Sequence, residues 1–140
     1  MTPARTSSTR GGSVRYLLLI YTDPEVYRTL SETDSKQLID DYWAFDDDIA
    51  KSGEIQAGEA LQAINTATTV RGKDREPLTT DGPFAETKEV LGGFYLVDVG
   101  DHDRALELAA KIPDVAWGLG AVEIRPIMEF TRDEEGAAGS

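Results

Sequence analysis

The sequence predicts an α+β fold in which two long helices cover one face of an antiparallel sheet. Strand-like and helix-like segments follow one another in the order strand, helix, strand, strand, helix, strand. A pair of shorter strand-like segments is inserted before the third long strand. The last strand contains Pro126, which cannot donate a hydrogen bond within a sheet and therefore belongs at an edge. This arrangement is typical of a ferredoxin-like sheet of split β-α-β units with an inserted hairpin.

The N-terminal half of the domain starts with an apolar strand. Residues 14–21 carry large apolar side chains at both odd and even positions, so both faces of this strand should be covered. An Asp-Pro pair ends the strand, and residues 25–30 should form one short helical turn. The second strand is predicted over residues 54–63, where Gly58 indicates a bulge or a close approach of another group.

The first long helix is predicted over residues 34–52. Asp34 and Gln37 would form a capping box at its start, and Gly53 is suited to end it. Apolar side chains recur at helical spacing and should form a buried stripe: Leu38, Tyr42, Phe45 and Ile49, flanked by Ile39 and Trp43. One face of this helix should therefore pack on the sheet.

The remaining elements are predicted from the same kinds of signal. In order they are a hairpin of residues 67–71 and 77–80 around a turn at 72–74, a strand at 93–99, a helix at 101–112 capped by Asp101, an irregular link at 115–121 with Trp117, and a strand at 121–130.

The two long helices cannot cover both faces of the predicted sheet. The first and third long strands nevertheless carry apolar residues on both faces. We therefore expect a second copy of the chain to cover the open face. The result would be a homodimer with its sheets face to face and a cavity between them or at their rim.

Composition excludes several classes of partner. The formal net charge of −12 would repel nucleic acids and anionic membranes. The chain has no cysteine, which rules out disulfides and thiolate chemistry. No segment has the ~20 apolar residues that span a bilayer, and no signal peptide is evident, so a cytoplasmic protein is expected. Residues 1–13 should be a disordered extension and 131–140 a polar tail, which leaves one domain at 14–130.

Residues 79–93 form a charged loop ahead of the third long strand. Its Asp-Gly-Pro sequence is a turn signal, because Gly82 permits a positive φ and Pro83 fixes its own φ. Acidic and basic side chains follow at Glu86 and Lys88. A charged loop that enters a buried strand is a common position for functional residues.

Short motifs along the domain resemble those of a known family. They are YLLLIY (16–21), AGEAL (57–61), ATTVR (67–71), TDGPFAETKE (80–89), GGFY (92–95), AKIP (110–113) and VEIRP (122–126). Together they closely resemble the DGPF branch of the YCII-related family, and the block at 80–89 is the most specific. The resemblance implies a ferredoxin-like subunit of a dimeric α/β barrel. It also implies relatives that include a dehydrochlorinase of chlorinated aromatics, with a suggested catalytic His–Asp pair, and members fused to extracytoplasmic-function sigma factors.

The chain departs from the wider family where that histidine would lie. The family's histidine is near the start of the first helix, but residues 35–42 contain none. The single histidine is His102, at the start of the second predicted helix. The His–Asp chemistry is therefore not carried over. The ligand spacing of a closed metal site and the motifs of a nucleotide loop are also missing, so we expect no metal and no cofactor.

Asp81, Glu59 and Lys88 are the candidate catalytic residues. Asp81 is either a general base or the side chain that caps its own turn. Glu59 would suit proton abstraction if it faced an apolar cavity, whereas on the outer face it is only a polar strand residue. Lys88 either holds an anionic substrate or acts as a proton donor, or it only forms a solvated ion pair.

The candidate ligand-binding residues come from the same loop and from the first long helix. They are Glu86, Tyr42, Gly82, Pro83 and Phe84. Tyr42 and its neighbour Trp43 could stack on an aromatic ligand, although aromatic residues at helical spacing more often belong to the core.

These residues lead to three hypotheses of function. The first is a cofactor-independent enzyme, lyase- or isomerase-like, that transfers a proton on a small organic molecule in a dimer-lined cavity. The second is a non-catalytic ligand-binding or regulatory dimer associated with an extracytoplasmic-function sigma factor. In the third, the loop only shapes the dimer interface.

Overall fold

The computed structural model describes residues 13–130. Apart from Ser13, the expected extension (1–13) and polar tail (131–140) lie outside these residues. The chain is a mixed α+β protein with antiparallel sheets, in the predicted order of elements. Within residues 13–130 neither sheet closes into a barrel, so the expected barrel would need a second copy.

The main sheet has four antiparallel strands in the order β2-β5-β1-β6. They are β1 (Val14–Thr22), β2 (Ile55–Ala60), β5 (Val90–Val99) and β6 (Gly120–Pro126). Helix α2 (Glu32–Ser52) connects β1 to β2, and these two strands lie on either side of β5. Helix α3 (His102–Lys111) connects β5 to β6, and these two strands lie on either side of β1. These are the two split β-α-β units that the sequence predicts, and the strand with Pro126 is at an edge as expected.

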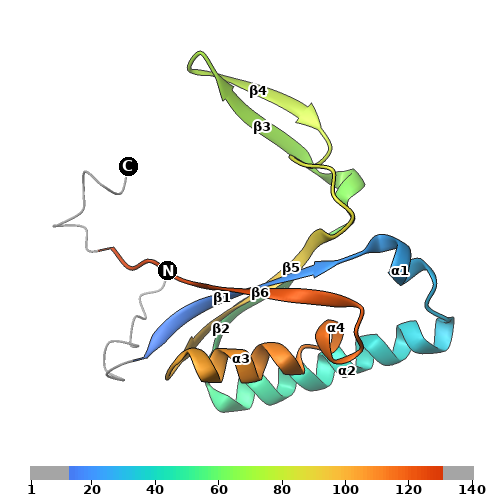
Figure 1. Ribbon diagram of the computed structural model, residues 1–140, viewed down its shortest axis with the longest axis vertical. Coiled ribbons are helices and arrows are strands. Elements are labelled where there is room, and N and C mark those ends of the chain that lie inside the picture. The colour runs from blue at the N-terminus through green and yellow to red at the C-terminus, as the bar shows by residue number, and fades with distance from the viewer. Residues whose placement is uncertain (1–12, 131–140) are drawn as a thin grey trace.

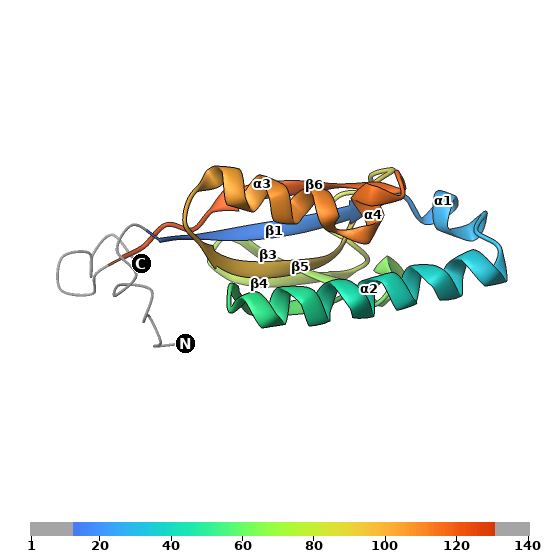
Figure 2. The same ribbon diagram turned by 90° about the horizontal axis from the view of Figure 1, so that it is seen from below.

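Helices α2 and α3 lie on one face of the sheet and form the core with it (Figures 1 and 2). Side chains alternate along β1: Leu18 and Ile20 are buried against the helices, whereas Leu17 and Leu19 are half-buried on the other face. The rest of the core comes from Tyr16, Phe45, Ile49, Tyr95, Val97, Val99, Ala105, Leu108 and Ile112. The second face of the sheet therefore stays open in a single chain.

Helix α2 begins two residues earlier than predicted. Its N-cap is Ser31, whose side chain accepts a hydrogen bond from the backbone N–H of Asp34 at 3.0 Å. Asp34 is therefore inside the helix, and the predicted capping box with Gln37 is wrong. Gly53 ends the helix in a left-handed conformation, as expected.

The predicted buried stripe of α2 is too wide. Leu38, Phe45 and Ile49 are buried, but Ile39 and Trp43 are 56% and 65% exposed. Both line a cavity instead of packing on the sheet. The periodicity of apolar residues identifies the side of the helix that faces the sheet. It does not distinguish residues that pack on the sheet from residues at the edge of that side, which stay exposed.

The C-terminal elements differ from the prediction in two places. The first two residues of the irregular link expected at 115–121 belong instead to the short helix α4 (Pro113–Ala116). This helix forms because Pro113 both stops α3 and suits the first turn of a new helix. Strand β6 ends at Pro126, four residues early. The chain still follows β1, since the Ile127 N–H donates to the Arg15 carbonyl at 2.9 Å.

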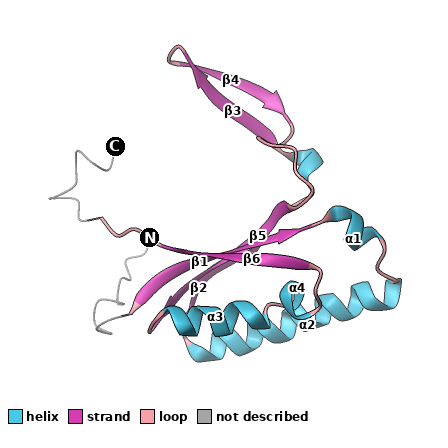
Figure 3. Ribbon diagram, viewed as in Figure 1, coloured by secondary structure: helices cyan, strands magenta, loops and turns pink. Residues whose placement is uncertain are grey.

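The inserted hairpin projects from the molecule on the side of the sheet opposite the helices (Figures 1 and 3). It consists of β3 (Thr68–Lys73) and β4 (Glu76–Asp81), and a short 3₁₀ helix, Ile64–Thr66, precedes it. Asp74 and Arg75 form its turn, both with positive φ, so the turn lies later than predicted. The short turn expected after β1 is confirmed as α1 (Pro24–Arg28).

Replacing Gly120 with alanine is expected to lower the free energy of unfolding by about 3 kcal/mol. A Cβ at this position would lie 2.3 Å from the backbone oxygen of Tyr21 in the paired strand, and backbone cannot move aside easily. Urea unfolding followed by circular dichroism measures the loss. Gly100→Ala is the control, because its Cβ would meet nothing within 4 Å. Equal stability of the two variants would contradict the close approach of β6 to β1.

Candidate functional site

A cavity of about 590 Å³ lies between α2 and the end of the main sheet where β2 and β5 meet. It is lined by Ile20, Thr22, Tyr27, Ile39, Tyr42, Trp43, Asp46, Gly58, Glu59, Ala60, Leu61, Gly92, Gly93, Phe94, Tyr95 and Asp114. We call it the Asp114 cavity. Its size is typical of sites that bind small organic molecules, and most of its lining is apolar or aromatic.

Asp114 is the most buried polar residue of this cavity, with 2% of its surface exposed. One carboxylate oxygen accepts a hydrogen bond from the Tyr27 hydroxyl, and the other accepts one from the Tyr42 hydroxyl. The partners come from α1 and α2, whereas Asp114 is the second residue of α4. The carboxylate therefore ties three helices together at the floor of the cavity.

Local structure holds Asp114 in this position. Pro113 opens α4 with its fixed φ, and the Leu119 N–H closes the following turn on the Asp114 carbonyl at 2.8 Å. The segment after α3 is thereby folded back against α2. The short helix α4 therefore places one carboxylate in the protein interior without the burial of a longer helix.

A second tyrosine–aspartate pair lies on the sheet side of the cavity. The Tyr95 hydroxyl donates to Asp46 Oδ1 at 2.5 Å, and the Tyr95 ring packs edge-on against Phe45 with 5.3 Å between centroids. Gly58 in the neighbouring strand makes room for this ring, because a Cβ there would lie 2.7 Å from it. The predicted close approach at Gly58 is confirmed, and the bulge in β2 lies next to it, between Ile55 and Ala57.

Burial raises the pKa of Tyr27, Tyr42 and Tyr95 above the ordinary tyrosine value, and the hydrogen bonds to Asp114 and Asp46 raise it further. All three hydroxyls are therefore protonated at neutral pH and act as donors to the carboxylates. None of the three is poised to act as a base.

We expect these three tyrosines to remain protonated in the folded protein at pH values where free tyrosine ionises, about 10. Above that pH the folded protein holds protons that the unfolded chain has lost. The free energy of unfolding should therefore be unaffected below pH ~10 and fall as the pH rises beyond it.

Ultraviolet difference absorbance of tyrosinate, recorded alongside circular dichroism, measures this titration. Tyr42→Phe should remove one of the late-titrating groups. Ionisation of all five tyrosines near the ordinary value, while the protein stays folded, would contradict the hydrogen-bonded arrangement.

The mouth of the cavity is formed by the exposed flank of α2. Trp43 and Ile39 both line the cavity and are more than half exposed. The other tryptophan, Trp117, lies outside the lining and donates to Asp41 at 2.8 Å. Trp43 is thus placed to contact both solvent and a molecule inside the cavity.

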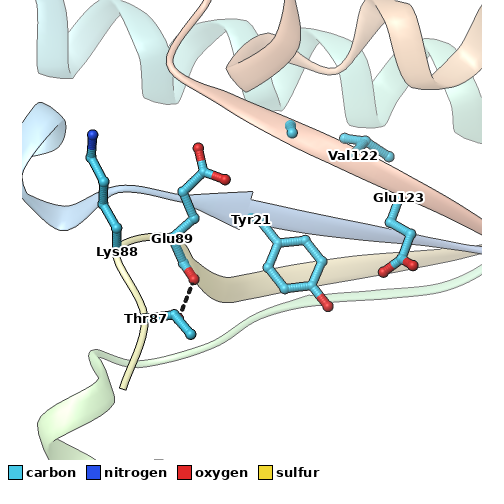
Figure 4. A pocket seen from close by; sticks show the side chains of 7 residues that line it. Tyr21, Thr87, Lys88, Glu89, Val122 and Glu123 are labelled. Atoms are coloured by element: carbon cyan, nitrogen blue, oxygen red, sulfur yellow. Dashed lines mark hydrogen bonds between the residues drawn. The ribbon is translucent and has the colours of Figure 1, made fainter. Parts of the chain in front are cut away.

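A second pocket, of about 510 Å³, lies beside the end of β1 and the start of β6. Its lining consists of Tyr21, Thr87, Lys88, Glu89, Ala121, Val122 and Glu123. In Figure 4 the Lys88 amine and the Glu123 carboxylate lie at opposite ends of this pocket. The Thr87 hydroxyl donates to the Glu89 carbonyl at 2.5 Å and holds the loop in place.

The structure does not bring the predicted site residues together. Tyr42 and Glu59 line the Asp114 cavity, and Lys88 lines the second pocket. The other five line neither of these two: Asp81, Gly82, Pro83, Phe84 and Glu86. Glu59 pairs with Phe94 in the sheet, while Gly58 pairs with the inward-facing Tyr95, so the Glu59 side chain belongs to the open face.

The Asp-Gly-Pro turn is tied to the base of the hairpin. Gly82 has a φ of 100°, as predicted, and its N–H donates to the Ala67 carbonyl at 2.8 Å. The Thr69 hydroxyl donates to the Gly82 carbonyl at 2.7 Å. Phe84 is exposed and packs under the Arg71 guanidinium, 4.6 Å from the ring centroid. These contacts shape the loop, and the catalytic and binding roles of its residues stay predictions.

Sequence reasoning missed Asp114, Asp46, Tyr27 and Tyr95 as site residues. Asp114 directly follows the AKIP motif, which was the available signal, but it lay between the predicted helix at 101–112 and the predicted link at 115–121 and was assigned to neither. In residues 13–130 no cluster of histidine and acidic side chains is arranged to hold a metal ion. Over the same residues, no helix combines the length and the apolar character needed to cross a membrane.

The fold and the site define a small α+β domain with an aromatic cavity of small-molecule size and a buried carboxylate at its floor. The chain belongs to the YCII-related family: the YCII-related domain matches residues 14–131. It is similar to an uncharacterised protein of Rhizobium meliloti (strain 1021), with 33% identity over 119 residues. The match covers 85% of this chain and 96% of that relative.

Proposed function

We propose that this YCII-related protein binds a small organic molecule in the Asp114 cavity. The supporting observation is the cavity itself: about 590 Å³, walled by aromatic and aliphatic side chains, with one buried carboxylate at its floor. In a mostly apolar cavity, a small number of polar groups fix the orientation of a bound ligand. The block at 80–89 further supports membership of the DGPF branch.

Binding is better supported than catalysis at this cavity. Both oxygens of Asp114 already accept hydrogen bonds, and the tyrosines are held protonated. A general base needs an accessible lone pair in reach of the substrate proton. Proton transfer by Asp81, Glu59 and Lys88 is therefore the second candidate function, and it depends on a homodimer. If Asp81→Asn and Lys88→Met keep full turnover of a substrate once one is found, that assignment is wrong.

The proposed homodimer is supported by the open face of the main sheet. Leu17, Leu19, Phe94 and Leu96 are cross-strand neighbours on this face, and all four are only half-buried. The hairpin projects on the same side (Figure 1). A second copy seated there would complete a ferredoxin-like dimeric barrel and bring the loop between β4 and β5, residues 82–89, close to the seam.

A non-catalytic regulatory dimer is the alternative for the same fold. The absence of histidine from residues 35–42 favours it, since the chemistry suggested for the wider family is then missing. In this proposal the ligand acts as a signal, and an extracytoplasmic-function sigma factor is the partner. Recovery of no sigma factor in a pull-down, together with steady turnover of a metabolite, would count against it.

A thermal-shift screen against metabolites tests the binding proposal. A ligand present at about 100 times its Kd should stabilise the protein by about 2.7 kcal/mol and raise its melting temperature. Each hit is then repeated with Trp43→Ala, which should weaken binding, and with Trp117→Phe, which should not, because only Trp43 lines the cavity. Hits that are insensitive to Trp43→Ala, or a screen without hits, would refute the proposal.

A further inference from the structure

The charged lining of the Asp114 cavity has one sign. Asp46 and Asp114 contribute carboxylates, and the lining contains no lysine, arginine or histidine from the described residues. Arg28, on the neighbouring helix α1, is exposed and paired with Glu25. An anionic ligand would therefore enter the cavity without a cation to pair with it.

The tyrosines of the lining offer hydrogen-bond acceptors, not donors. A tyrosine hydroxyl has one proton, and in Tyr27, Tyr42 and Tyr95 that proton is donated to Asp114 or Asp46. Each of the three oxygens keeps lone pairs that can accept a further hydrogen bond. A polar group of the ligand that meets these oxygens must therefore be a donor.

The aromatic lining adds a second source of attraction for positive charge. Trp43 stands at the mouth, and the Tyr27, Tyr42 and Tyr95 rings line the interior. Aromatic faces attract cations, and tryptophan does so most strongly. Asp46 accepts the hydrogen bond of Tyr95 through Oδ1 and also lines the Asp114 cavity. Its negative charge therefore adds to the attraction of the aromatic rings for a cation.

From these three observations we infer that the ligand of the Asp114 cavity is a small organic ammonium ion with an apolar body. The inference rests on the proposed function and names its ligand class. The ammonium N–H groups bind the tyrosine oxygens and the Asp46 carboxylate, and the apolar part packs against Trp43 and Ile39. The net charge of −12 also raises the local concentration of such cations.

Three compounds of similar size and shape test the charge preference: 2-phenylethylamine, 2-phenylethanol and 3-phenylpropanoate. Binding is read from the fluorescence of Trp43 in a Trp117→Phe protein, where it is the only indole. The amine should bind at least tenfold more tightly than the alcohol, and the carboxylate should give no saturable change. Asp46→Asn keeps an acceptor for Tyr95 and should weaken amine binding about tenfold while leaving the alcohol unchanged.

Asp48→Asn is the matched control, because it removes the same charge from an exposed position of the same helix. If it weakens amine binding as much as Asp46→Asn does, the amine responds only to overall charge and the inference fails. Equal affinity for all three compounds, or no saturable binding of the amine, also overturns it. Equal affinity for the three compounds would contradict only the ligand class, and the proposed function would still hold. A metabolite screen without hits would refute the proposed function itself.

Discussion

Replacing Asp114 with alanine is expected to lower the free energy of unfolding by about 3 kcal/mol, a large share of the total stability of a small domain. The substitution removes the acceptor of both the Tyr27 and the Tyr42 hydroxyl. Each hydroxyl then loses a charge-assisted hydrogen bond in a place where water reaches poorly. Helices α1, α2 and α4 would also lose the group that joins them.

The asparagine variant separates hydrogen bonding from packing. Asp114→Asn has nearly the same shape but keeps one acceptor and adds a donor, so one tyrosine stays paired. We expect a smaller loss, about 1–2 kcal/mol. Asp48→Ala, at an exposed position of α2, should change stability by less than about 0.5 kcal/mol.

Urea unfolding monitored by circular dichroism gives these free energies. A double-mutant cycle between Asp114→Ala and Tyr42→Phe then isolates their interaction, which should exceed about 1 kcal/mol. If Asp114→Ala proves as stable as Asp48→Ala, the carboxylate does not hold the three helices. Other contacts would then have to keep α1, α2 and α4 in place around the cavity.

The fold was predictable because its signals are local and repeated. The apolar run at residues 14–21 predicted a strand, and Pro126 predicted an edge position for the last strand. What failed were the boundaries and the flank of α2. Ser31 and Asp34 are both good N-caps, and only the extended backbone at Ser31 decides between them. Trp43 carries the right period for the core but lies where the sheet ends.

The site was largely unpredictable because its contacts join distant parts of the chain. The Tyr27–Asp114 and Tyr42–Asp114 pairs are 87 and 72 residues apart, and the Tyr95–Asp46 pair is 49 apart. No spacing rule connects such positions. The segment at 79–93 was predicted as a site because its charged residues are adjacent in sequence. In the fold this segment runs from the end of the hairpin into β5, and its charged residues do not line the Asp114 cavity. Tyr42 was found because helical periodicity placed it next to the core.

Replacing Leu19 with arginine is expected to separate the proposed homodimer into monomers. Leu19 lies on the open face of β1, opposite Phe94 in β5 and Glu123 in β6. In the proposed homodimer this position is near the centre of the packed sheets, and each dimer would bury two unpaired charges. A cost of about 3 kcal/mol or more weakens association at least a hundredfold.

Sedimentation velocity checks this prediction. The unchanged protein should sediment at twice its chain mass of 15.3 kDa, and Leu19→Arg at the single mass at the same concentration. Circular dichroism should be unchanged, because Leu19 faces away from the helices and its loss leaves the core intact. Leu106→Arg is the matched control: it places the same side chain on the exposed side of α3 and should leave the dimer unaffected. A stable single copy of the unchanged protein would mean that its half-buried leucines face water, and the proposed seam beside the loop at 82–89 would not exist.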